Sequence, residues 1–253
     1  MRVQKEDSKK EKVKILFLGV GSPLSQRYYN VSIVINDFIL LDAPPGVDKK
    51  IMEYDLQLAN IDYVFITHFH GDHILGLPQF LLNMRMMERN NPLYVIGPEG
   101  IDGIAKSLLK LTFRGEEEDI IKKSKTVFVS VSKEIEQKKI ANLTFEAYKL
   151  SHGSEVNYGY LIHQNDKKIG YTGDTGLCEN LEILIEKSDI IILDMTFEKT
   201  TKSHLGIDYA KIKSNKYKDK LFFGIHRGKE IDNIALEDIK GVIFPPDGDI
   251  YEF

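Results

Sequence analysis

The sequence predicts an α+β protein in which two β-rich halves pack sheet against sheet, with helices on the outer faces. Short apolar runs of strand length recur through both halves of the chain, and segments with helical spacing lie between them. A chain of 253 residues is also long enough to bury a full core in one large domain. These observations together favour packed sheets over a helical bundle or a repeat array.

The first half is expected to alternate strands with helices. Asn36-Asp37 separates two apolar runs and is a turn signal for a hairpin. Asp48 can cap the first helix, and Pro78 suits the first turn of the second. The segment 114–125 is a charged connector, and we interpret 114–139 as a whole as a solvated loop and strand edge. The expected strands are 13–18, 31–35, 38–41, 63–66 and 93–96, and the expected helices are 48–58, 77–88 and 99–111.

The second half repeats this pattern with more strands. A helix is expected at 177–187 and another from residue 206 or 207. The expected strands are 127–131, 143–150, 158–163, 168–171, 190–193, 221–224 and 241–244. Residues 1–12 are mostly charged and are predicted to be a flexible tail, so that residues 13–253 would form a single hydrolase domain.

Composition excludes several classes of protein. The net charge of -4 argues against a broadly basic surface that coats nucleic acid. Cys178 is the single cysteine and cannot form an internal disulfide. The apolar run 13–20 is too short for a secretory signal, and no apolar stretch approaches a membrane span. We therefore expect a cytoplasmic protein.

The most informative segment is 67–73, Thr-His-Phe-His-Gly-Asp-His, which follows an apolar run. Imidazole nitrogens and carboxylate oxygens are the usual ligands of catalytic zinc. In an extended segment His68 and His70 point the same way and can bind one ion, while Gly71 lets the backbone turn so that Asp72 and His73 face a second. Burying this much unpaired polarity would cost roughly 1–3 kcal/mol per group. A metal site is therefore the favoured interpretation.

Three further ligand-type residues follow strands in the same manner, namely His152, Asp174 and His226. Each lies just beyond an apolar run, where an α/β scaffold usually presents its chemistry. His163, by contrast, lies within an alternating stretch, and we interpret it as an ordinary core or surface histidine.

The ordered set H-x-H-x-D-H, His152, Gly173-Asp174-Thr175 and His226 resembles the metallo-β-lactamase superfamily over nearly the whole chain. Within it, the segments 17–23, 70–78 and 93–100 are similar to the ribonuclease Z-like branch. The resemblance implies a four-layer αββα sandwich, with the metals in a groove at one edge of the two sheets.

The resemblance also implies a dinuclear, metal-dependent phosphodiesterase or nuclease that works through a metal-bound hydroxide. Asp174 would bridge the two ions, and Asp72 would also orient or deprotonate the attacking water. Zinc is the first expectation for both ions, with manganese or iron as alternatives. One ion would be held by His68, His70 and His152, and the other by Asp72, His73 and His226.

A second motif of the branch assists the leaving group. Asp194-Met195-Thr196-Phe197 and His204 occupy its places, so His204, steadied by Asp194, would be the general acid. Aspartate stands where the family usually has glutamate, so we expect a shorter reach to His204. Further candidates for contacts with the substrate are Ser22, Arg27 and Arg227.

The chain departs from ribonuclease Z itself in one respect. Many members insert an arm that grips transfer RNA between the third ligand motif and the bridging aspartate, whereas one compact hairpin separates His152 from Asp174 here. We therefore expect a cyclic nucleotide or a single-stranded nucleic acid as substrate. Relatives often form dimers, so a homodimer is also expected.

Three alternatives remain open at the level of sequence. An ester, thioester or lactone hydrolase could use the same ligands. A non-catalytic scaffold subunit could share the fold, although every expected ligand position is filled. A redox iron site is a weaker alternative, because ligand type alone does not fix the ion.

Overall fold

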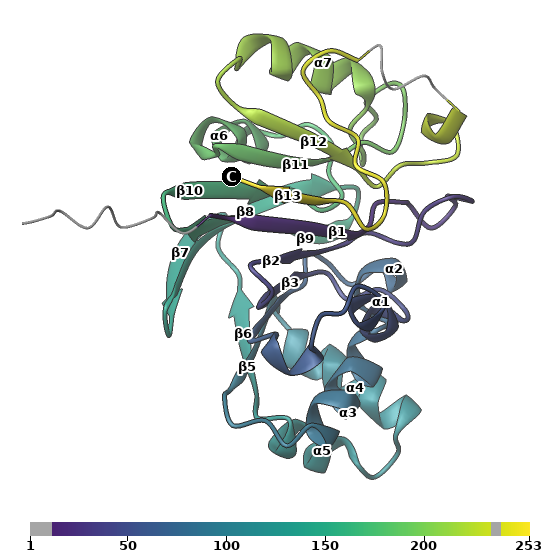
Figure 1. The fold of residues 1–253 in the computed structure, drawn as a ribbon, viewed down its shortest axis with the longest axis vertical. Coiled ribbons are helices and arrows are strands. Elements are labelled where there is room, and N and C mark those ends of the chain that lie inside the picture. The colour runs from purple at the N-terminus through teal and green to yellow at the C-terminus, as the bar shows by residue number, and fades with distance from the viewer. Residues whose placement is uncertain (1–11, 234–238) are drawn as a thin grey trace, which may run out of the picture.

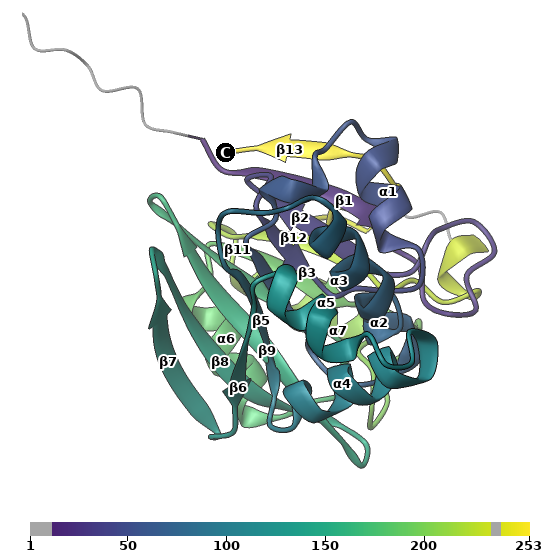
Figure 2. The ribbon, with the colours of Figure 1, turned by 90° about the horizontal axis from the view of Figure 1, so that it is seen from below.

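The computed structural model describes residues 12–233 and 239–253, and two β-sheets packed face to face dominate it (Figure 1). Helices α1 to α5 cover the outer face of the first sheet, and α6 and α7 cover the outer face of the second (Figures 1 and 2). The predicted four-layer αββα sandwich is thus confirmed. The predicted tail lies outside the described residues except for Lys12, and the single domain over 13–253 stays a prediction.

The first sheet has seven strands in the order β13-β1-β2-β3-β4-β5-β6. The pairs β3–β4, β4–β5 and β5–β6 are parallel, whereas β13, β1, β2 and β3 pair antiparallel. The strands are β1 (Lys14–Gly19), β2 (Ser32–Ile35), β3 (Ile39–Leu41), β4 (Tyr63–Phe65), β5 (Leu93–Pro98), β6 (Thr126–Val131) and β13 (Ile250–Glu252).

The second sheet has six strands in the order β12-β11-β10-β9-β8-β7. Its β10, β11 and β12 are parallel, and β7 to β10 form an antiparallel meander. The strands are β7 (Ile135–Ile140), β8 (Leu143–His152), β9 (Glu155–Gln164), β10 (Lys167–Tyr171), β11 (Ile190–Asp194) and β12 (Leu221–Ile225).

The helices pack through their apolar faces on these sheets. Pro78 lies in the first turn of α3, as predicted, where its missing N–H leaves no carbonyl unsatisfied. The helices are α1 (Val47–Glu53), α2 (Gly71–Ile74), α3 (Leu77–Met86), α4 (Ile101–Thr112), α5 (Glu117–Lys123), α6 (Glu179–Lys187) and α7 (Ile207–Lys216), with short 3-10 turns at Leu58–Asn60 and Ile231–Asn233.

Strand β1 illustrates why two sheets form. Its side chains alternate, so that Ile15 and Phe17 enter the core between the sheets while Leu16 and Leu18 pack under the helices. Because both faces are apolar, the strand is buried on both sides. The predicted turn at Asn36 and Asp37 joins β2 to β3, and both residues have positive φ, as a tight type I′ hairpin requires.

Several predicted elements differ from the structure. Asp48 is in the first turn of α1 but does not cap it, because the helix already begins at Val47, after Gly46. That helix also ends at Glu53 rather than at residue 58. The predicted strand 241–244 is only an isolated bridge between Ile243 and Phe223. A bridge of this kind lacks the repeated hydrogen bonds that would define a strand.

Two strands were absent from the prediction. Strand β7 lies in the segment interpreted as a solvated loop and edge, and its residues alternate between exposed and half-buried. It forms by pairing with β8, so no apolar pattern marks it in the sequence. The short β13 is added to the first sheet through β1 in the same way.

The parallel strands of both sheets end on one side of the sandwich. There the chain leaves β4 toward the histidine cluster, β10 toward Asp174 and β12 toward His226. The loops at this edge therefore bring together residues that are distant in sequence. No helix in the described part of the chain has the length and apolar content to span a bilayer.

Candidate metal centre and its cavity

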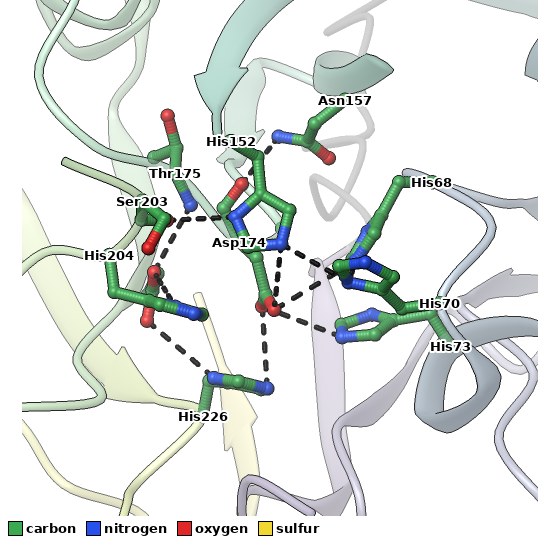
Figure 3. A network of polar contacts seen from close by, with 12 residues as sticks. His68, His70, His73, His152, Asn157, Asp174, Thr175, Ser203, His204 and His226 are labelled. Atoms are coloured by element: carbon green, nitrogen blue, oxygen red, sulfur yellow. Dashed lines mark hydrogen bonds and ion pairs between the residues drawn. The ribbon is translucent and has the colours of Figure 1, made fainter. Parts of the chain in front are cut away.

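The ligand-type residues lie close together (Figure 3), and most of them line one cavity. This cavity has a volume of about 630 Å³ and lies where the loops of the two sheets meet. Of the predicted residues, it is lined by Ser22, His70, Asp72, His152, Asp174, His204 and His226. His68 and His73 lie behind this lining and are fully buried.

The first triad consists of His68, His70 and His152. The Nδ1 atom of His70 lies 3.0 Å from Nε2 of His68 and 3.2 Å from Nε2 of His152. Ligand bonds of 2.0–2.1 Å in a tetrahedral zinc site place nitrogen atoms about 3.3 Å apart. The three nitrogens thus have the spacing of ligands that share one ion.

The second triad consists of Asp72, His73 and His226. The Oδ2 atom of Asp72 lies 3.4 Å from Nε2 of His73 and 3.4 Å from Nε2 of His226. Asp72 and His73 lie in the one-turn helix α2, which begins at Gly71. The predicted turn at Gly71 is therefore the start of a helix, and this helix presents both side chains toward β12.

The carboxylate of Asp174 lies between the two triads. Its Oδ2 atom is 3.8 Å from Nε2 of His68 and 3.9 Å from Nε2 of His152. Its Oδ1 atom is 3.4 Å from Nε2 of both His73 and His226. Each oxygen of this one carboxylate therefore faces one triad, which is the arrangement of a bridging ligand.

Outer partners orient the histidine rings. Nδ1 of His68 contacts Oγ1 of Thr67 at 3.0 Å, and Nδ1 of His73 contacts Oδ2 of Asp42 at 2.8 Å. Nδ1 of His152 lies 2.8 Å from the carbonyl oxygen of Ser203, and Nδ1 of His226 lies 2.7 Å from Oγ1 of Thr196. Because Nδ1 is occupied in these four rings, Nε2 is the nitrogen left for an ion.

Two buried atoms at the centre of the site test whether a metal fits. Nε2 of His73 and Oδ1 of Asp174 are buried without a hydrogen bond among the described residues, and they face each other at 3.4 Å. A buried polar atom without a partner is costly unless an ion or water satisfies it. The donor atoms of the site are imidazole nitrogens and carboxylate oxygens, which are ligands of divalent metal ions. Together with the two unsatisfied atoms, they fit a metal site.

The pKa values of the site residues reflect this crowding. Burial, followed by the neighbouring His73, holds the pKa of His68 well below its usual value. Burial also raises the pKa of Asp72, but hydrogen bonds from His226 and His73 outweigh it and leave that pKa lowered. The shifts favour a neutral His68 and an ionised Asp72, as a metal ion requires. At His73 and His226 the charge of Asp174 outweighs burial and raises the pKa, to about 10 for His226, so an ion would displace a proton from these two rings.

Asp194 and His204 lie beside the second triad. Oδ2 of Asp194 is 3.0 Å from Nδ1 of His204, so the shorter aspartate still makes the contact, contrary to the expectation of reduced reach. Burial lowers the pKa of His204, but the hydrogen bond and charge of Asp194 more than offset it. The raised pKa favours the protonated ring, the form that a general acid needs.

The structure brings only one of the three predicted substrate contacts into the cavity. Ser22 lines it. Arg27 is exposed and does not line the cavity. Arg227 is buried, with its guanidinium 3.8 Å from the ring centre of Tyr28 and Nη2 donating to the carbonyl of Pro245. Arg227 therefore supports the cavity wall and does not face the cavity.

Sequence reasoning missed Asp42, which is fully buried behind the site. It also accepts hydrogen bonds from the backbone N–H and the hydroxyl of Thr67 and from the hydroxyl of Tyr171. Asp42 follows strand β3, so the rule that located the other acidic residues after strands would have found it. The cavity wall also includes residues that no motif marked, among them Leu24, Glu155, Lys229 and Glu230.

The charged side chains of the wall other than the site residues are Glu155, Lys229 and Glu230. Their sum is one net negative charge. A groove that follows a nucleic-acid backbone is instead rich in lysine and arginine. The cavity thus has the size of a small-ligand site and lacks a basic lining.

Comparison with known proteins places these features in a family. A family model described as "Anti-Pycsar protein Apyc1" matches residues 13–241. Curated relatives include a ribonuclease Z of Metallosphaera sedula, 29% identical over 236 residues, with 79% of each chain covered. A ribonuclease Z of Thermococcus kodakarensis is 26% identical over 263 residues, covering 85% of this chain and 84% of the relative.

Solved structures confirm the metallo-β-lactamase fold. The short form of human tRNase Z superposes with a TM-score of 0.76 at 18% identity, covering 94% of this chain and 98% of that chain. At this level of identity the likeness concerns the fold. The match extends along nearly the whole described chain, including both sheets.

Proposed function

The chain belongs to the Anti-Pycsar protein Apyc1 family, within the ribonuclease Z-like branch of the metallo-β-lactamase superfamily, and we propose that this metal-dependent phosphodiesterase acts on cyclic mononucleotides. The observation that carries the proposal is a cavity of about 630 Å³ with the two triads at its floor. Cavities of roughly 300–1,000 Å³ enclose small molecules. A mononucleotide fits this range, whereas a folded RNA does not.

The short connection between His152 and Asp174 further supports a small substrate. Residues 155–164 and 167–171 form one hairpin, β9 and β10, with a two-residue turn. An arm that grips transfer RNA has no place in this segment. The slight excess of acidic side chains in the wall also disfavours a long polyanion.

We further propose that the site binds two ions, with zinc as the first expectation for both. His68, His70 and His152 would hold one, Asp72, His73 and His226 the other, and Asp174 would contact both. The spacing of these donor atoms supports the assignment. Bound ions would supply Lewis acidity toward a phosphate oxygen and toward a water molecule.

The remaining steps belong to side chains of the chain itself. Asp72 lines the cavity, orients the water that attacks phosphorus and accepts the proton that this water loses. As the ester P–O bond breaks, His204 donates its proton to the departing oxygen, and the Asp194 carboxylate stabilises the charged ring beforehand. Ser22 contributes a hydroxyl near the phosphate. The product is a linear nucleoside monophosphate.

A homodimer is proposed in addition. Leu24 lines the cavity and is 78% exposed, and Leu75, which directly follows α2, is 51% exposed. Apolar side chains that are this exposed, one of them in the cavity lining, favour a partner surface. Analytical ultracentrifugation of wild type and Leu24→Glu tests this, since a monomer in both would contradict the dimer.

The substrate assignment is tested with parallel assays of metal-loaded protein. The panel consists of cyclic mononucleotides, single-stranded RNA, single-stranded DNA, bis-p-nitrophenyl phosphate and p-nitrophenyl acetate. We expect the highest kcat/KM for a cyclic mononucleotide. Preference for either single strand would reassign the substrate, and turnover of the acetate ester alone would overturn phosphodiester chemistry.

A further inference from the structure

Asn157 lies beside the backbone of Asp174, on the side away from its carboxylate (Figure 3). It lies in β9 and is fully buried. Its side-chain Nδ2 donates to the carbonyl oxygen of Thr172 at 3.2 Å and to that of Asp174 at 2.7 Å. One side chain thus spans the turn that carries the candidate bridging carboxylate.

The turn itself has little freedom. Gly173, its central residue, has φ +56°, and a Cβ atom there would lie 2.7 Å from Cβ and Cγ2 of Thr67. Beyond the turn, the N–H of Thr175 donates to Oδ2 of Asp194 at 3.1 Å. Asn157 therefore fixes the backbone on one side of a turn that Thr67 already confines on another.

The neighbouring residue extends the same support to the first sheet. The N–H of Tyr158 donates at 3.0 Å to the carbonyl oxygen of Thr67, which directly precedes His68. In the second sheet Asn157 pairs in register with Leu150, two residues before His152. The first half of β9 thus contacts the segment before His68, the strand that ends at His152 and the turn that carries Asp174.

The unpaired half of the amide indicates why asparagine stands here. Oδ1 of Asn157 is buried without a hydrogen bond among the described residues. An apolar side chain of similar size would avoid this cost but would supply no donors for the two carbonyls. The two hydrogen bonds that fix the turn therefore stabilise the structure by more than the unsatisfied acceptor costs.

We propose that Asn157 is a positioning residue that holds Asp174 midway between the two triads and so allows one protein to bind two ions at once. The inference rests on the proposed dinuclear centre. Asn157 touches neither ion nor substrate and acts only through the turn. Without its two hydrogen bonds, the turn relaxes and the carboxylate moves toward one triad.

Asn180 offers a matched control. Its Nδ2 likewise donates to two backbone carbonyls, those of Lys149 at 2.8 Å and Glu134 at 3.3 Å, but it lies outside the catalytic cavity. Asn157→Ala and Asn180→Ala each remove two hydrogen bonds of the same type. Only the first removes them from the turn that carries Asp174.

The test titrates chelator-stripped proteins with Mn²⁺ alone, and follows binding by calorimetry and coupling between the ions by electron paramagnetic resonance. In Asn157→Ala we expect a second-ion Kd raised by about tenfold to a hundredfold and a larger share of uncoupled Mn²⁺. Asn180→Ala should stay within about twofold of wild type, as most substitutions away from such features do. Unfolding of the metal-free variants by denaturant measures the purely structural loss separately.

The outcomes distinguish failure of the dinuclear centre from failure of the role of Asn157. A wild type that binds fewer than two ions overturns the dinuclear centre, and the role of Asn157 with it. A wild type that binds two coupled ions, with Asn157→Ala unchanged in second-ion Kd and coupling, overturns the role of Asn157 alone. Should the alanine variant fail to fold, Asn157→Ser keeps one donor, and an unchanged second-ion Kd in that variant likewise overturns the proposal.

Discussion

Oδ2 of Asp42 lies 2.8 Å from Nδ1 of His73, which joins the end of β3 to the one-turn helix α2. The same carboxylate accepts the hydroxyl of Tyr171 from the second sheet at 2.5 Å. A single buried acid therefore connects a candidate metal ligand to both sheets. Such outer partners set the tautomer and direction of a ligating histidine.

Asp42→Asn should weaken metal binding more than it changes the fold. An amide NH₂ in the place of Oδ2 would oppose both the N–H of His73 and the hydroxyl of Tyr171, and in the place of Oδ1 it would oppose the backbone N–H of Thr67, so at least one donor loses its acceptor in either orientation. We expect zinc affinity to fall about tenfold to a hundredfold in a competition assay with a chromophoric chelator. The control is Asp37→Asn, at a surface carboxylate that pairs with Lys14. Equal zinc affinity in the two variants would contradict this role.

His204→Ala should impair leaving-group protonation without loss of metal. Removal of a general acid lowers kcat by about 10²–10⁴ for substrates with a poor leaving group. For bis-p-nitrophenyl phosphate the loss should be much smaller, because p-nitrophenolate departs without a proton. Measuring kcat for both substrates, with metal content determined in parallel, shows whether His204 protonates the leaving group. An equal loss on both would assign His204 a role other than general acid.

Gly173→Ala isolates the crowding at the turn. The position combines φ +56° with close contact to Thr67, whereas Gly115 has φ +86° with nothing within 4 Å of a Cβ atom. Alanine at positive φ costs more than about 1 kcal/mol in either place, and steric overlap adds to it only at residue 173. Denaturant unfolding should show the larger loss for Gly173→Ala. Equal losses would mean that the turn is less confined than the structure indicates.

The substrate size predicts a weak response to salt. Nucleic-acid binding that neutralises several phosphates loses about 10³–10⁵ in affinity between roughly 50 and 200 mM salt. A mononucleotide carries one phosphate, and the wall contributes Lys229 against Glu155 and Glu230. We expect KM for a cyclic mononucleotide to change by less than about threefold over that range. A steep rise in KM would indicate a substrate with many phosphate contacts.

The sequence predicts that the candidate ligands meet at one edge, because each of them follows an apolar run, while their roles stay predictions. His73, Asp174 and His226 converge since the strands that precede them end at the same edge. Residues that depend on tertiary pairing were harder to predict. Arg227 looks like a phosphate contact in sequence, but stacking on Tyr28 buries it. Strand β7 has four polar residues between Ile135 and Ile140 and forms by pairing with β8.

The most direct test of a dinuclear phosphodiesterase measures turnover of a cyclic mononucleotide while zinc is added back to chelator-stripped protein. A dinuclear phosphodiesterase should show no hydrolysis in the stripped protein and full activity only as a second equivalent of zinc binds, with a linear monophosphate as product. Asp174→Ala should not reach wild-type activity even at saturating zinc. Full activity at one equivalent, or in the stripped protein, would contradict a dinuclear phosphodiesterase.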